Sequence, residues 1–122
     1  MSLESLLSEM KSIKGYKAAG VMTFTGEMLA SDSTDPNIDL DVVGATFNDI
    51  FRGAHEAAGK VGLKAAKETI IQTPNGTIVM ACSGVDSPVH FHVITILDSD
   101  GNQALAKLSI DKLMPKILTE LQ

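Results

Sequence analysis

The spacing of apolar and polar residues at the start of the chain predicts a helix followed by a β-hairpin. Residues 2–14 carry their apolar side chains on one helical face, made of Leu3, Leu6, Leu7, Met10 and Ile13. Gly15 is placed to end this helix. Residues 16–24 then have the pattern of a strand, residues 25–27 that of a tight turn, and residues 28–31 that of a short return strand.

A long amphipathic helix is predicted over residues 39–61, after a loop at residues 32–37. At about 100° per residue its apolar stripe consists of Val43, Phe47, Ile50, Phe51, Ala54, Ala57, Ala58 and Val61. Its polar face consists of Asp41, Asn48, Asp49, Arg52 and Glu56. The stripe changes from large residues to alanine along the helix, which allows close approach to a partner surface. That surface is either the sheet of the same chain or another subunit.

Three further strands are predicted over residues 64–73, 77–83 and 89–97. Residues 74–76, Pro-Asn-Gly, join the first two as a hairpin turn. The third is apolar on both faces, which is typical of a central strand covered on both sides. A turn at residues 98–102 follows it.

The last segment has two interpretations. From Ile110 onward one helical stripe is formed by Leu113, Met114, Ile117, Leu118 and Leu121. Leu105 and Leu108 fall on a different side of the wheel, and Pro115 removes a hydrogen bond from a continuous helix.

Either one kinked helix runs over residues 103–121, or a short strand at 104–110 precedes a helix that Asp111 caps. The broken stripe favours the second interpretation. The order of the main elements is helix, two strands, helix, three strands, helix. Short hairpin connections imply antiparallel pairing, so the predicted fold is a single α+β domain spanning residues 1–122, with one antiparallel sheet and helices on both faces.

Composition narrows the classes of function. The 122 residues carry a formal net charge of −5 without a basic cluster, which argues against nucleic-acid and anionic-membrane binding. The single cysteine, Cys82, cannot form an internal disulfide, so a reducing cytoplasm is expected. No segment approaches about 18 consecutive apolar residues, and the N-terminus does not have the pattern of a signal peptide.

His90 and His92 are the strongest candidates for chemistry. Two residues apart on a strand, they point to the same face and could ligate a metal together with His55, Cys82 or an aspartate. The commoner role of such a pair is that of polar residues on a half-covered sheet face, and this interpretation is favoured. Cys82 could act as a nucleophile beside a histidine, but a lone cysteine in an apolar strand is more often a small buried hydrophobe.

Three segments together resemble the prokaryotic type of the roadblock (dynein light-chain) family. The first is the opening helix with residues 15–22, Gly-Tyr-Lys-Ala-Ala-Gly-Val-Met, and the turn and return strand at residues 25–31. The second is the long helix at residues 39–61, and the third is residues 101–108, Gly-Asn-Gln-Ala-Leu-Ala-Lys-Leu. The resemblance covers nearly the whole chain, and it rests on the order of the pieces since no one motif is diagnostic.

The resemblance implies a profilin-like sheet with strand order 2-1-5-4-3. It also implies a homodimer that joins third strands, here residues 64–73, and packs the long helices together. The interface residues expected from it are Phe47, Ile50, Ala54, Ala58, Thr69, Ile70 and Ile71. Members of the family are platforms or regulators for small Ras-like GTPases, or motor-complex subunits, with no cofactor and no catalytic residues.

The function predicted first is therefore a non-enzymatic, homodimeric interaction module of the cytoplasm that regulates or scaffolds a small GTPase. A heterodimer with a related chain is an alternative assembly. The alternative function is a small-ligand or metal sensor that uses His90 and His92.

Overall fold

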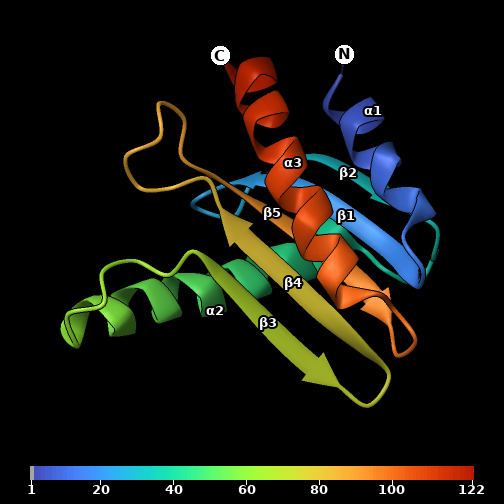
Figure 1. Cartoon of the computed structure of the whole chain (residues 1–122), viewed down its shortest axis with the longest axis horizontal. Helices are drawn as coiled ribbons and strands as arrows, with labels where there is room; N and C mark the ends of the chain where they lie inside the picture. The colour runs from blue at the N-terminus through green and yellow to red at the C-terminus, as the bar shows by residue number, and fades with distance from the viewer. Residues whose placement is uncertain (1) are drawn as a thin grey trace.

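The computed structural model describes residues 2–122 as one antiparallel sheet covered by helices (Figure 1). Its helices are α1 (Leu3–Ser8), the 3-10 helix η1 (Glu9–Ser12), α2 (Leu40–Lys60) and α3 (Gln103–Leu121). Its strands are β1 (Tyr16–Thr23), β2 (Met28–Ser33), β3 (Glu68–Thr73), β4 (Gly76–Cys82) and β5 (Phe91–Asp98). Within the described residues no helix is long and apolar enough to cross a bilayer.

The strands lie in the order β2-β1-β5-β4-β3, and every neighbouring pair is antiparallel. The predicted α+β class, element order and strand order are thus confirmed. β5 lies in the centre of the sheet, as its two apolar faces indicated, and β2 and β3 form the edges. α1 and α3 cover one face of the sheet, while α2 covers the other (Figure 1).

Two apolar cores result from the strict alternation of side chains along the strands. On β4, Val79 and Ala81 join the core under α1 and α3, whereas Ile78, Met80 and Cys82 join the core under α2. The same alternation directs every second residue of β5 toward α2. The α2 side of the sheet therefore carries the candidate site residues.

α3 is one continuous helix through Pro115, so the favoured strand-and-helix interpretation of this segment was wrong. The buried stripe continues backward from Ile110 through Ala106, while Leu105 and Leu108 are exposed. Asn102, not Asp111, caps the helix by accepting a hydrogen bond from the Leu105 N–H at 3.0 Å. Pro115 lies on the exposed side, where water can reach the carbonyl that loses its partner.

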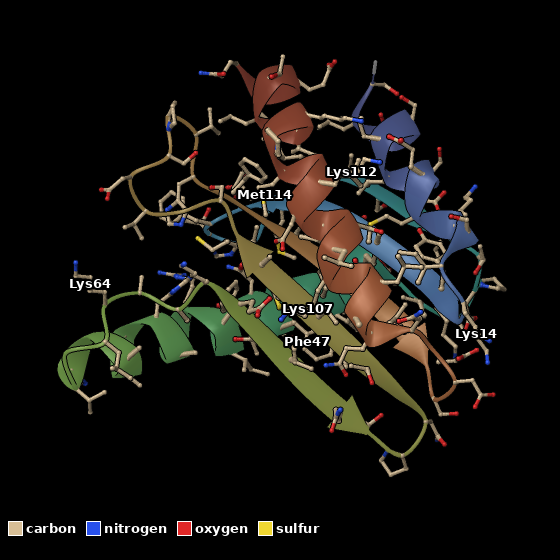
Figure 2. The ribbon with its side chains drawn as sticks, in the orientation of Figure 1. Lys14, Phe47, Lys64, Lys107, Lys112 and Met114 are labelled. Atoms are coloured by element: carbon tan, nitrogen blue, oxygen red, sulfur yellow. The ribbon has the colours of Figure 1, made fainter. Side chains whose placement is uncertain are left out.

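β3 begins at Glu68, four residues later than predicted. The preceding Lys64 has a φ of 67°, which is incompatible with an extended strand. α3 is tied to β3 by an ion pair of 2.8 Å between Lys107 and Glu68 and by a hydrogen bond of 3.2 Å between Gln72 and Gln103. Figure 2 labels Lys107 on α3. These contacts hold the face of β3 and leave its outer edge without a neighbouring strand.

α2 packs on the sheet with one edge of its predicted apolar stripe, where Phe51 is buried and Val43 and Phe47 are half-buried against the same core. Its buried residues are Leu40, Gly44, Asn48 and Phe51. Gly44 permits the close approach, because a Cβ there would lie 2.7 Å from Cε of Met28. Much of the predicted apolar stripe therefore faces outward, with Ile50 49% exposed and Val61 71% exposed.

Candidate functional site

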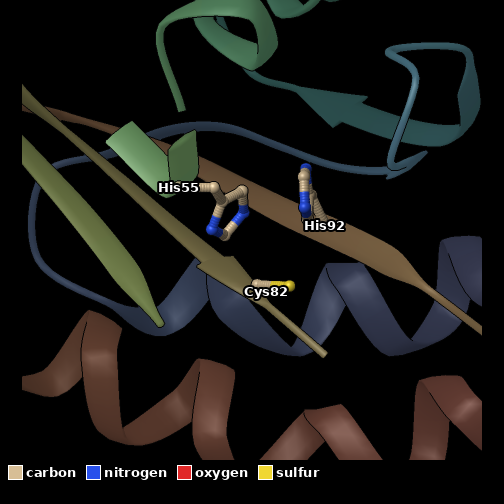
Figure 3. A group of neighbouring side chains, drawn as sticks. All are labelled: His55, Cys82 and His92. Carbon is tan, nitrogen blue, oxygen red and sulfur yellow. The ribbon is translucent and has the colours of Figure 1, made fainter. Parts of the chain in front are cut away.

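The three histidines and the cysteine of the chain gather on the α2 face of the sheet. β5 carries His92, the loop before β5 carries His90, α2 carries His55 and β4 ends at Cys82. The centroids of the His90 and His92 rings lie 5.3 Å apart, which confirms that these residues share a face. Figure 3 shows how His55, Cys82 and His92 converge from their three elements.

A pocket of about 300 Å³ opens above these residues. It is lined by Phe24, Arg52, His55, Glu56, Val85, His90 and His92. His92 is fully buried at its base, whereas Arg52 and Glu56 are exposed and bring opposite charges to its wall. The site therefore joins the buried His92 to an opening that a small molecule or ion can reach.

Asn48 organises the interior of this site, although the sequence placed it on the polar face of the helix. That placement was wrong, because Asn48 is fully buried and lies next to His92. Its Nδ2 donates to the carbonyl of Phe24 at 2.9 Å, which fixes its Oδ1 as an acceptor. Oδ1 lies 2.6 Å from Nδ1 of His92, so Nδ1 is the atom that carries the imidazole proton.

This assignment leaves Nε2 of His92 with a free lone pair. Among the described residues nothing forms a hydrogen bond with that buried atom, nor with Nδ1 or Nε2 of His55. Both rings pack on Phe51, with centroid distances of 4.5 Å for His55 and 4.8 Å for His92. Buried polar atoms nearly always have a partner, so this group of three nitrogens calls for a ligand.

Cys82 completes the group from the end of β4. Its Sγ lies 3.2 Å from Nε2 of His90 and accepts a hydrogen bond of 3.3 Å from the Gly84 N–H. Ser83 brings the two ends of the intervening loop together, because its Oγ donates to the Val89 carbonyl and accepts from the Phe91 N–H. The loop therefore holds His90 against the sulfur.

Burial sets the protonation of the site. It lowers the pKa of His92 to about 3, and Coulombic interactions with His90, His55 and Arg52 lower the pKa of His92 further. Burial also lowers the pKa values of His55 and His90. Near neutral pH the three imidazoles are therefore uncharged and their lone pairs are available.

Burial acts on Cys82 in the opposite sense and raises the pKa of its thiol. The neighbouring His90 is uncharged for the reason given above. A cysteine nucleophile needs a lowered thiol pKa and a cationic neighbour, and this pair has neither. The arrangement suits a ligand-binding role better than nucleophilic catalysis.

No family model matches the chain. An uncharacterized protein of Methanocaldococcus jannaschii is 24% identical over 115 residues, which span 94% of this chain and 92% of that protein. A Roadblock/LC7 domain from Streptomyces avermitilis superposes with a TM-score of 0.85 at 12% identity, covering 99% of this chain and 98% of that one. MglB of Myxococcus xanthus superposes with a TM-score of 0.80 at 15% identity, covering 95% and 91%.

The chain has the roadblock fold. Profilin IA of Acanthamoeba castellanii shares the wider architecture, with a TM-score of 0.59 at 9% identity and coverage of 98% of this chain and 96% of that one. The roadblock fold thus accounts for the five-stranded sheet and its three helices. At these identities the likeness shows the fold alone.

In the roadblock fold of this chain, the residues predicted for a dimer interface lie on α2 and on the edge strand β3. Ile50 is exposed, and the other six, Phe47, Ala54, Ala58, Thr69, Ile70 and Ile71, are half-buried. On β3 the two isoleucines diverge, since Ile70 packs against the α1–α3 core and Ile71 against the α2 core.

Proposed function

We propose that this protein is a homodimeric roadblock interaction module of the cytoplasm that regulates or scaffolds a small Ras-like GTPase and has no catalytic activity of its own. The observation that carries the proposal is a second apolar stripe on α2, next to the unpaired edge of β3. We call it the outer stripe, and it consists of the exposed Ile50, Ala57 and Val61 together with the half-buried Phe47 and Ala54. Phe47 also packs against the core under α2.

The outer stripe has the spacing of a helix–helix seam. Its members follow one another at intervals of three, four, three and four residues, which is the alternation that keeps a seam facing a partner helix. The residues that α2 buries against its own sheet, such as Gly44 and Phe51, lie on a neighbouring side. α2 therefore has apolar surface left over, and its alanines permit a close approach by a second helix.

β3 offers the second half of the interface. An edge strand presents unpaired N–H and C=O groups and pairs readily with another strand. Two β3 edges joined antiparallel would extend the sheet across a two-fold axis and bring the two outer stripes together. One surface would then serve both copies, as a symmetric dimer requires.

The GTPase part of the proposal is supported by fold neighbours and by the family that the sequence resembles. A gliding protein of Thermus thermophilus, MglB, superposes with a TM-score of 0.77, and another MglB structure is described as a tetrameric arrangement. MglC of Myxococcus xanthus superposes with a TM-score of 0.69 at 23% identity. Roadblock proteins commonly act as GTPase platforms, and a dimer of this chain would present such a platform.

The dimer is tested by the substitution Ile50→Lys. Ile50 is 49% exposed, so a lysine there should leave the fold of one chain intact while placing a charge in the seam. Light scattering after gel filtration should give twice the chain mass for the native protein and the chain mass for the variant. Val42→Lys is the matched control, because Val42 is a 65% exposed valine of the same helix outside the outer stripe.

A native protein with the mass of one chain at high micromolar concentration would rule out the dimer. If both lysine variants dissociate alike, the interface lies elsewhere. If neither dissociates, the outer stripe is not the seam.

The partner is tested by a pull-down from native lysate with GDP and, in parallel, with a non-hydrolysable GTP analogue. A Ras-like GTPase retained preferentially in one nucleotide state is the expected result, and Val42→Lys protein should retain it equally. Retention of motor or structural subunits alone would make the protein a scaffold outside GTPase control.

A further inference from the structure

We propose that His55, Cys82 and His92 form a binding site for a Zn²⁺-type transition-metal ion, with the fourth coordination position open to the pocket beside Phe24. The proposal does not depend on the dimer or on a GTPase partner.

The donor atoms already lie close together. One ligand atom from each of the three residues falls within 4.8 Å of the other two. Donors on a tetrahedral zinc ion, at about 2.0 Å for nitrogen and 2.3 Å for sulfur, lie roughly 3.5 Å apart. A contraction of about 1 Å would therefore close the site, and His55 is free to make it because no described residue holds its ring by a hydrogen bond.

The orientation of His92 matches that of a metal ligand. A ligating histidine usually donates its second ring N–H to a fixed acceptor, which selects the tautomer and aims the other nitrogen at the metal. Here Oδ1 of Asn48 is that acceptor, and the Phe24 carbonyl fixes the amide in turn. The remaining Nε2 is fully buried and unpartnered within residues 2–122, and His92 lies beside His55 and Cys82 (Figure 3).

The sulfur of Cys82 is prepared in a similar way. The Gly84 N–H donates to Sγ, and Nε2 of His90 lies 3.2 Å from the same sulfur. Gly84 has a φ of 112°, a conformation that glycine adopts without strain, so the turn that aims this N–H depends on it. Metal binding releases the thiol proton, and donors of this kind stabilise the thiolate that remains. We assign His90 as a positioning residue for the sulfur and not as a ligand.

The donor set selects the class of metal. Two imidazoles and a thiolate suit zinc and copper, whereas calcium and magnesium take oxygen ligands. Three protein ligands with an open position are typical of zinc sites that bind a water or another small ligand in the fourth position. The pocket above His92 provides the space for that ligand.

The direct test is a metal titration of untagged, chelator-treated protein. Calorimetry with Zn²⁺ alone should give one ion per chain, because the sequence contains three histidines and one cysteine in total. Titration with Co²⁺ should add a sulfur-to-cobalt charge-transfer band together with intense visible absorption from a tetrahedral ion. A stoichiometry near zero, or Co²⁺ binding without the charge-transfer band, would overturn the proposal.

Substitutions assign the ligands. Cys82→Ser should abolish the charge-transfer band, and Cys82→Ser and His55→Gln should each lower Zn²⁺ affinity by at least 100-fold. His90→Gln should keep the band and lose only about 10- to 100-fold in affinity, as outer-shell partners do. Complete loss with His90→Gln would overturn the three-ligand assignment, and native affinity with Cys82→Ser would overturn the site.

A matched control separates coordination from damage to the fold. Glu56→Gln alters another residue of the pocket wall that is not a proposed ligand, and its Zn²⁺ affinity should stay within a few-fold of native. Zn²⁺ should raise the melting temperature of the native protein and of Glu56→Gln, and leave that of Cys82→Ser and His55→Gln unchanged. Equal rises in all four would show that the metal binds elsewhere and would overturn the site.

Discussion

The pair formed by Asn48 and His92 links the backbone of the turn between β1 and β2 to the pocket. Both residues are fully buried, and Asn48 bonds both to the Phe24 carbonyl and to Nδ1 of His92. Replacing Asn48 with leucine would leave the Phe24 carbonyl and Nδ1 of His92 without partners. Each unpaired buried group costs roughly 1–3 kcal/mol, so Asn48→Leu should destabilise the metal-free protein by an amount in that range or above it. Urea unfolding in the presence of a chelator measures the change.

A double-mutant cycle provides the control for this pair. His92→Phe removes the histidine that needs a partner, so Asn48→Leu should cost less in that background than in the native one. Equal costs in the two backgrounds would mean that the two side chains do not stabilise each other.

Residue types indicated part of this site, but the contact between its elements could not be read from the sequence. The period of a strand places His90 and His92 on one face, and that prediction was confirmed. Asn48 was assigned to the solvent because polar residues are usually exposed, yet Gly44 lets α2 pack on the sheet with the side that carries Asn48. The rotation of a helix about its own axis depends on such packing, which hydrophobic periodicity alone does not specify.

At the scale of elements, α3 shows a helix that tolerates an interior proline. Pro115 withholds the hydrogen bond that the Asp111 carbonyl would otherwise accept, and it is exposed, so its replacement loses no core contact. Pro115→Ala should stabilise the protein by about 1–3 kcal/mol in thermal or urea unfolding. Lys116→Ala, a neighbouring exposed position, should change stability by less than about 0.5 kcal/mol. A loss of stability on removing the proline would show that α3 needs the distortion to fit the sheet.

The same helix shows why its continuity was not predicted. The search for a stripe gave weight to Leu105 and Leu108, which are exposed, and passed over the small Ala106, which is buried. The strands and turns were predicted more closely, because residues such as Gly76 fix the hairpin positions directly. Boundaries that depend on a single backbone conformation, such as that of Lys64 before β3, were not accessible from the pattern.

For the molecule as a whole, the two faces of the sheet have separate roles. The face under α1 and α3 is an ordinary apolar core, tied to the edge strand by the Lys107–Glu68 ion pair. The α2 face holds the three histidines, of which His92 is buried, and the outer side of α2 carries the outer stripe. A ligand in the pocket and a partner on α2 would therefore touch the same helix from two sides. The affinity for the partner can be measured with and without bound metal in the same protein.

The net charge of the whole molecule makes the salt dependence of the proposed dimer informative. Each chain carries a formal charge of −5, so two chains that meet repel each other, with a total of 2 × −5 = −10. The outer stripe is apolar, and burial of apolar surface is not weakened by screening. Raising sodium chloride from about 0.05 M to about 0.5 M shortens the range of the repulsion and should strengthen the dimer several-fold. Sedimentation equilibrium of the native protein measures this change, and a dimer that weakens as salt rises would show that ion pairs, not the outer stripe, hold the two copies together.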